Sequence, residues 1–192
     1  MGLAFSSANL LASGAKDAKV KIWNPDTGGL LKTLLHSHAV YSVAFSTTNS
    51  SILAAGSYTI RLFDVDTGNL LFILDPLEVS MMTYSCAFSS RNILATASDF
   101  SAKLWNPGTG TLIQTLVGHT SNCFGVAFNP SGLLATSSYD LTIKLWNPET
   151  GVCLNTITGH SSNINGLAFS SSGLLASASF DQTCRQWSLV AG

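Results

Sequence analysis

Two sets of histidine, hydroxyl and carboxylate side chains are the residues of this chain that could do acid–base chemistry. The sets share one spacing and consist of His119, Thr136 and Asp140, and of His160, Ser177 and Asp181. A histidine held by a carboxylate can take the proton of a hydroxyl group, which is how serine hydrolases make a nucleophile. A catalytic site occurs once, whereas this set recurs one period later, and no other nucleophile or base is placed. The sequence therefore favours a structural role and a non-enzyme, with a hydrolase as the weaker alternative.

Histidine and cysteine could instead bind a metal ion. His36 and His38 are close in sequence, but no third ligand accompanies them. The cysteines show no Cys-x-x-Cys pair and no shared position, and they are Cys86, Cys123, Cys153 and Cys184. Metal sites and disulfide frameworks need such spacing. We expect no metal, no cofactor and reduced thiols buried in strands, as in an intracellular protein.

An internal period explains the repetition. Two aromatic markers recur every 40 to 43 residues, and they are Phe5, Phe45, Phe88, Phe128 and Phe169, and Trp23, Phe63, Trp105, Trp146 and Trp187. Such self-similarity indicates a repeat architecture. The repeats lie approximately at 2–34, 35–74, 75–116, 117–157 and 158–192, and together they form one domain.

Within one period the pattern is typical of short strands. Alternating apolar and polar residues, separated by Pro, Gly, Asn and Asp turns, predict four strands at 125–130, 133–138, 142–147 and 153–158. A period of this length with four strands is typical of a β-propeller blade. We therefore predict an all-β propeller of five four-stranded antiparallel blades. The tail after Trp187 is too short for a fourth strand, so the last blade is expected to lack it.

The chain resembles the WD-repeat family over essentially its whole length. The resemblance rests first on the Gly-His pairs that end at His119 and at His160. It rests also on an Asp that lies six residues before a Trp, and on Trp-Asn, Phe-Asp or Trp-Ser where the family has Trp-Asp. It implies a hydrogen-bonded tetrad inside each blade. Two repeats match it fully, with His119, Thr136, Asp140 and Trp146, and with His160, Ser177, Asp181 and Trp187. The repeat style is similar to that of fungal NACHT–WD receptors and bacterial multi-repeat proteins.

The first three repeats depart from this pattern. The first repeat has Ser13, Asp17 and Trp23 but no histidine. The second repeat has His36, with Ala55 at the place of the hydroxyl residue and Phe63 at that of the Trp. The third repeat has Thr96, Asp99 and Trp105. In the third repeat Asp75–Glu78 replaces the Gly-His pair. We predict that the second and third repeats are the least stable.

Ring closure is left open by the sequence. Five repeats are fewer than the family's rings usually have, and the missing fourth strand prevents ordinary closure. Three alternatives remain. The chain is a piece of a larger propeller, such as the sensor array of a NACHT–WD receptor; or it forms an open arc; or it is a subunit that completes a ring with another copy. An open arc would expose sheet edges, which invite self-association.

The resemblance implies a protein-interaction scaffold whose loop face binds protein or peptide partners. Candidate contact residues on that face are Tyr41, Phe124, Tyr139, Phe180, Asn122, Asn163 and Asn165, although some of the rings could instead pack between blades. The net charge is −1 and no basic cluster occurs, so we do not expect nucleic acid as a main partner. No apolar run reaches the ~20 residues of a membrane span. We expect a cytoplasmic protein, with the nucleus as the alternative.

Overall fold

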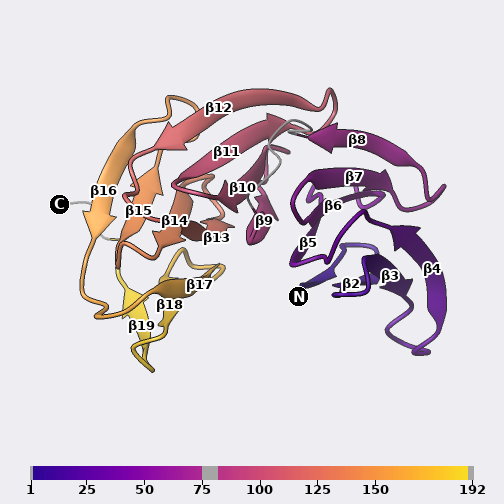
Figure 1. Cartoon of the computed structure of the whole chain (residues 1–192), viewed down its shortest axis with the longest axis horizontal. Coiled ribbons are helices and arrows are strands. Elements are labelled where there is room, and N and C mark those ends of the chain that lie inside the picture. The colour runs from indigo at the N-terminus through magenta and orange to yellow at the C-terminus, as the bar shows by residue number, and fades with distance from the viewer. Residues whose placement is uncertain (1, 75–81, 190–192) are drawn as a thin grey trace.

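The computed structural model describes residues 2–74 and 82–189, and every regular element in these ranges is a β-strand. The strands form five antiparallel sheets, here called blades 1 to 5, which follow one another around an arc (Figure 1). Four blades have four strands and blade 5 has three, β17, β18 and β19. The predicted five-bladed all-β propeller with an incomplete last blade is therefore confirmed.

The strands follow the order of the chain within each blade. Blades 1 and 2 contain β1 (Leu3–Phe5), β2 (Leu11–Gly14), β3 (Lys19–Trp23), β4 (Leu30–Leu35), β5 (Ser42–Phe45), β6 (Ile52–Gly56), β7 (Ile60–Asp64) and β8 (Leu70–Leu74). Blades 3 and 4 contain β9 (Ser85–Phe88), β10 (Leu94–Ser98), β11 (Ser101–Asn106), β12 (Thr111–Val117), β13 (Cys123–Phe128), β14 (Leu134–Ser138), β15 (Ile143–Trp146) and β16 (Cys153–Ile157). Blade 5 contains β17 (Ile164–Phe169), β18 (Leu175–Ser179) and β19 (Cys184–Trp187).

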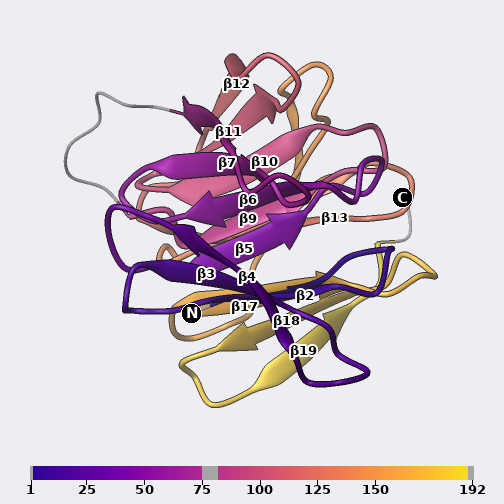
Figure 2. The ribbon, with the colours of Figure 1, turned by 90° about the vertical axis from the view of Figure 1, so that its right-hand side faces the viewer.

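The first strand of each blade lies on the inner side of the arc, and the fourth strand lies at its outer rim (Figure 1). The inner strands pack in sequence, β1 on β5, β5 on β9, β9 on β13 and β13 on β17. Blades 1 and 5 both lie at the lower, open side of the arc (Figures 1 and 2). The loops that enter the inner strands are thereby gathered around one centre.

The turn between the third and fourth strands is built alike in blades 1 to 4. The residue after the recurring Trp or Phe of the third strand accepts a backbone N–H of the turn through its side-chain oxygen, and these residues are Asn24, Asp64, Asn106 and Asn147. A glycine with positive φ then ends each turn, namely Gly28, Gly68, Gly110 and Gly151. Because an amide oxygen accepts these bonds as a carboxylate does, Trp-Asn can stand where the family has Trp-Asp.

The apolar core lies between blades. Four clusters join successive blades, and each combines one face of a sheet with the opposite face of the next. The cluster between blades 3 and 4, for example, contains Leu104 and Leu116 on one side and Leu134 and Trp146 on the other. Each blade is therefore stabilised mainly by its neighbours.

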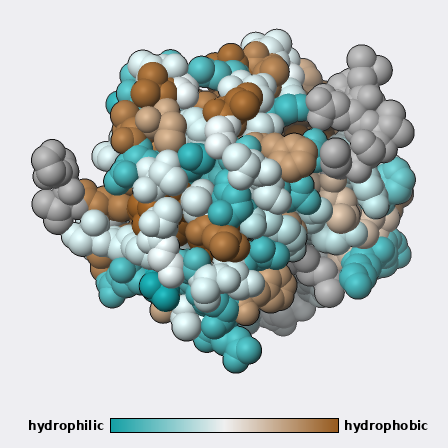
Figure 3. Space-filling view, turned by 60° about the vertical axis from the view of Figure 1, so that its left-hand side comes forward, coloured by the Kyte–Doolittle hydropathy of each residue, from teal (hydrophilic) through white to brown (hydrophobic). Residues whose placement is uncertain are grey.

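The outer surface mixes apolar and polar side chains. Figure 3 shows apolar groups scattered between hydrophilic ones on the side that lies at the left in Figure 1. Of the four cysteines, Cys86 and Cys123 are buried, as expected, whereas Cys153 and Cys184 are exposed, because their strands lie at the rim and at the end of the arc. In the part of the chain that the structure describes, no helix is long and apolar enough to cross a membrane.

Candidate functional site

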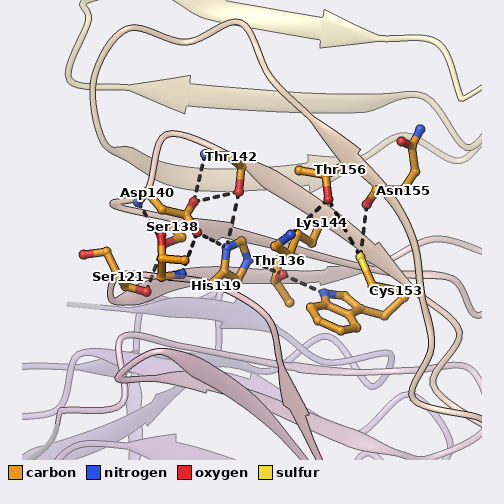
Figure 4. Close-up of polar contacts among 12 residues, drawn as sticks. His119, Ser121, Thr136, Ser138, Asp140, Thr142, Lys144, Cys153, Asn155 and Thr156 are labelled. Atoms are coloured by element: carbon orange, nitrogen blue, oxygen red, sulfur yellow. Dashed lines mark hydrogen bonds and ion pairs between the residues drawn. The ribbon is translucent and has the colours of Figure 1, made fainter.

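The structure brings together the four side chains of each predicted tetrad in blades 4 and 5. In blade 4 the Trp146 indole N–H donates to Thr136 Oγ1 at 2.8 Å, and His119 contacts Thr136 through Nε2 at 2.7 Å and Asp140 through Nδ1 at 2.8 Å (Figure 4). An ionised carboxylate only accepts, so Nδ1 carries the imidazole proton and Nε2 accepts from the hydroxyl. The corresponding distances in blade 5 are 2.8, 2.7 and 2.7 Å.

Electrostatics favours the neutral imidazole and the ionised carboxylate. Burial lowers the pKa of His119 against the raising effect of its bond to Asp140. Burial acts to raise the pKa of Asp140, but hydrogen bonds from Thr142, from the Thr120 N–H and from His119 together hold it below its ordinary value. In blade 5 the hydroxyl of Thr183, with His160 and backbone donors, keeps the pKa of Asp181 low despite burial.

This arrangement has the connectivity of a hydrolase triad, but its hydroxyl is enclosed. Thr136 is 0 % exposed, and Ser177 in the other tetrad is also buried. Each hydroxyl already accepts an indole N–H and donates to the imidazole, so no substrate can approach the oxygen. The tetrads are suited to satisfying buried polar groups, which would otherwise destabilise the fold.

The first three blades hold only parts of this network. The indole of Trp23 donates to Ser13 Oγ at 2.8 Å, and that of Trp105 donates to Thr96 Oγ1 at 2.9 Å. The predicted replacement at residues 75–78 lies outside the described residues. Blades 1 and 3 therefore keep the indole-to-hydroxyl half of the tetrad.

Blade 2 keeps the histidine of the tetrad but lacks its hydroxyl, its indole and its carboxylate. His36 is buried, its Nδ1 accepts the Ser37 N–H, and its Nε2 has no partner because Ala55 replaces the hydroxyl. Burial, together with the nearby Arg61 charge, lowers the pKa of His36 to about 4. Four of the five buried side-chain nitrogen and oxygen atoms without a partner, among the described residues, belong to this blade, at His36, Ser57, Thr59 and Arg61. This supports the prediction that blade 2 is less stable, which hydrogen exchange would test.

A row of aromatic rings runs across blades 2 to 4. Phe124 stacks between Tyr84, with centroids 3.9 Å apart and planes at 19°, and Tyr139, at 4.2 Å and 9°. Burial and the nearby rings of Tyr139, Tyr41 and Tyr58, together with Asp99, raise the pKa of Tyr84. We call Tyr41, Tyr84, Phe124 and Tyr139 the aromatic row.

A cavity of about 350 Å³ opens beside this row. Its lining combines three of the rings with the start of the inner strands, and consists of Tyr41, Tyr84, Ser85, Phe124, Gly125, Asn165, Gly166 and Leu167. All three rings are half-buried, so they are held in place yet remain partly accessible; Phe124, stacked between Tyr84 and Tyr139, is accessible at its edge rather than at its faces. Rigid rings beside an amide and a hydroxyl are suited to holding a flexible ligand by stacking and a few hydrogen bonds.

The structure separates the other predicted contact residues. Phe180 is 60 % exposed and lies outside this cavity. Asn122 and Asn163 act through their backbone carbonyls, which accept the N–H groups of Tyr139 and Phe180 at 2.9 Å. Of the seven candidates, Tyr41, Phe124 and Asn165 line the cavity, and Tyr139 joins it through the stack.

Tyr84 is the site residue that sequence reasoning missed. It lies four residues before Phe88, just as Tyr41, Phe124 and Asn165 each lie four residues before the corresponding phenylalanine of their repeats. Alignment of the repeats on the inner strand would have found it. The position is aromatic in three consecutive blades, which is why the rings meet.

The described residues line two further, smaller hollows. One of about 250 Å³ lies beside the ion pair of Arg91 with Glu149, and one of about 270 Å³ is lined by Phe88, Phe128 and Phe169 with polar neighbours. In the described ranges no three His, Cys, Asp or Glu side chains gather closely enough to hold a metal ion.

Comparison with known proteins places the repeats. The family described as "WD domain, G-beta repeat" matches residues 1–24, 28–64, 110–147 and 151–188. The COMPASS component SWD3 of Saccharomyces cerevisiae is 34% identical over 120 residues, which are 56% of this chain and 38% of that protein. Nuclear distribution protein PAC1 of Arthroderma otae is 34% identical over 67% of this chain and 31% of its own length. Autophagy-related protein 16 of Arabidopsis thaliana is 30% identical over 69% of this chain and 26% of its own length.

The chain thus spans less than two fifths of the length of each of these relatives. The family matches cover well over half of the chain and include both complete tetrads. The chain belongs to the WD-repeat family.

Proposed function

We propose that this protein is a non-catalytic scaffold that binds an extended segment of a partner protein along the aromatic row. The observation that carries the proposal is the three-ring stack of Tyr84, Phe124 and Tyr139 beside a cavity of about 350 Å³. Pre-ordered aromatic rings lose little conformational entropy on binding and dominate many interfaces. One relative is, by its name, a component of COMPASS, which agrees with a role in assemblies.

The chemistry of the site favours a segment of mixed character. Tyr41 and Tyr84 offer apolar ring surface and Phe124 offers its ring edge, whereas Asn165 and Ser85 offer hydrogen bonds beside them. No Lys or Arg lines the cavity, so it has no cationic group for phosphate or nucleic acid. A peptide with an apolar or proline anchor and an exposed backbone suits this lining.

Peptide selection against the 192-residue chain tests this function. We expect selected peptides to lose about tenfold or more in affinity for Tyr84→Ala and Phe124→Ala, because each change removes a stacking partner. Isothermal titration calorimetry measures the loss. Leu112→Ala is the control, since Leu112 is exposed on the outer strand β12. Peptides that bind all three variants as tightly as the unaltered chain would contradict the proposal.

Separate observations bear on the hydrolase alternative, on the NACHT–WD alternative and on the cellular compartment. The enclosed hydroxyls of Thr136 and Ser177 argue against the hydrolase. The similarity in repeat style keeps a sensor array of a NACHT–WD receptor as the alternative context for the same binding face. The free cysteines support our proposal of a reducing compartment, the cytoplasm or the nucleus.

We also propose self-association, through a sheet face rather than the edges that the sequence suggests. In blade 1 Leu3 and Phe5 are 73% and 66% exposed, whereas Phe45 and Phe88, at the position of Phe5 in the next two blades, are buried between blades. We expect light scattering to show a mass that rises with concentration and that Phe5→Asp abolishes this rise. A monodisperse monomer for the unaltered chain would rule out the association.

A further inference from the structure

Blade 2 keeps a buried histidine but lacks the hydroxyl that binds the corresponding histidine of blade 4. His36 is 7% exposed, and its Nε2 has no hydrogen-bond partner among the described residues. In blade 4 the Nε2 of His119 lies 2.7 Å from Thr136 Oγ1. The residue of blade 2 at the place of Thr136 is Ala55. The imidazole of His36 therefore has a methyl group where its counterpart has an oxygen atom.

Arg61 brings a second unpaired nitrogen to the same position. Strands β6 and β7 pair so that Arg61 lies directly opposite Ala55. Opposite residues of an antiparallel pair project their side chains from the same face of the sheet. The Nη1 of Arg61 donates at 3.2 Å to the carbonyl of Leu35, the residue before His36, whereas its Nε is buried without a partner. The guanidinium and the imidazole thus both lie beside Ala55.

The aromatic side chain beside this position is also smaller than in blade 4. Phe63 stands where blade 4 has Trp146, whose indole N–H donates to Thr136 at 2.8 Å. Phe63 has no N–H to donate, and it is buried with Ala55 in the cluster between blades 1 and 2. Both replacements reduce the side-chain volume beside the imidazole, and both make its surroundings more apolar.

The two unpaired nitrogens are both donors. Because His36 Nδ1 accepts the Ser37 N–H, the proton of the neutral imidazole is on Nε2. A guanidinium keeps its charge and has no acceptor, so the Arg61 Nε is a donor as well. Buried donors beside a positive charge favour an anion that accepts hydrogen bonds. A water molecule would need acceptors for its own protons, whereas a halide ion needs none.

We propose that blade 2 binds one halide ion, such as chloride, between His36 Nε2 and Arg61 Nε. The ion accepts both N–H groups at the place that a hydroxyl oxygen has in the tetrad of blade 4. It links the two blades, since the same guanidinium donates to Leu35 of blade 1. A monatomic ion is required, because Ala55 and Phe63 enclose the position with apolar groups. This site is separate from the aromatic row and from the proposed function.

Thermal unfolding in equal concentrations of sodium chloride and sodium gluconate tests the site. At about 0.2 M salt we expect the midpoint of the 192-residue chain to be about 2 °C or more higher in chloride, because an ion that binds only the folded state stabilises it. His36→Phe should unfold at the same temperature in both salts. Arg61→Lys keeps the charge but has no Nε–H, and should lose most of the difference. Leu112→Ala, on the outer strand β12, should keep it.

Two results of this measurement would overturn the proposal. One is an equal midpoint of the unaltered chain in the two salts, and the other is a difference that His36→Phe retains in full. Bromide allows a second measurement that needs no variant. Anomalous diffraction from crystals grown in sodium bromide should show a peak within hydrogen-bond distance of both nitrogens. Density for a water molecule there, without an anomalous peak, would contradict halide binding.

Discussion

Replacing Phe88 with alanine is expected to lower the free energy of unfolding by about 3 to 5 kcal/mol. Phe88 is 7% exposed and packs with Leu62, Leu94 and Trp105 in the cluster between blades 2 and 3. Truncation removes its apolar contacts and leaves a cavity that neighbouring strands cannot fill without moving. Urea unfolding monitored by tryptophan fluorescence measures the change.

Phe5 provides the matched control within the same chain. It occupies the same position of the repeat, but it is 66% exposed because no described blade packs on that face of blade 1. Phe5→Ala should alter the free energy of unfolding by less than about 0.5 kcal/mol, when measured below the concentration at which copies associate. Equal losses for the two variants would show that the outer face of blade 1 is covered in solution.

Replacing His119 with phenylalanine is expected to lower the free energy of unfolding by about 3 kcal/mol. The change keeps a ring of similar size but removes the bonds to Thr136 and Asp140. The Asp140 carboxylate then loses one of its donors while keeping those of Thr120 and Thr142, and the Thr136 hydroxyl loses its acceptor. Thermal and urea unfolding measure this loss, and the indole fluorescence of Trp146 reports the changed hydroxyl.

His36→Phe is the matched control for this second prediction. His36 holds the same place in blade 2 and is equally buried, but its Nε2 has no partner and its pKa is lowered to about 4. Replacing an unsatisfied buried polar group with an apolar ring should be neutral or stabilising, within about 1 kcal/mol. If His36→Phe destabilised the chain as much as His119→Phe, ring volume rather than the tetrad would account for both losses.

The sequence was sufficient wherever the structure is local and repeated. Blades form because each period carries the same alternation and turn residues, and the described part of the last repeat supplies the three strands β17, β18 and β19. The tetrads follow likewise, since His119, Thr136, Asp140 and Trp146 belong to one repeat and its connecting loop. Residues within one blade meet through the pairing of adjacent strands, which their spacing predicts.

The contacts between blades were decided only by the tertiary structure. Phe5 and Phe88 have the same residue type and the same place in their repeats, yet one is exposed and the other buried, because burial depends on which sheet lies against that face. The aromatic row shows the same dependence: Tyr84 comes from blade 3, Phe124 and Tyr139 come from blade 4, and Phe180 lies apart. The sequence determined each blade and its internal hydrogen bonds. The packing of blades around the arc decided which side chains became core and which stayed exposed, since a repeated pattern does not specify what lies next to it in space.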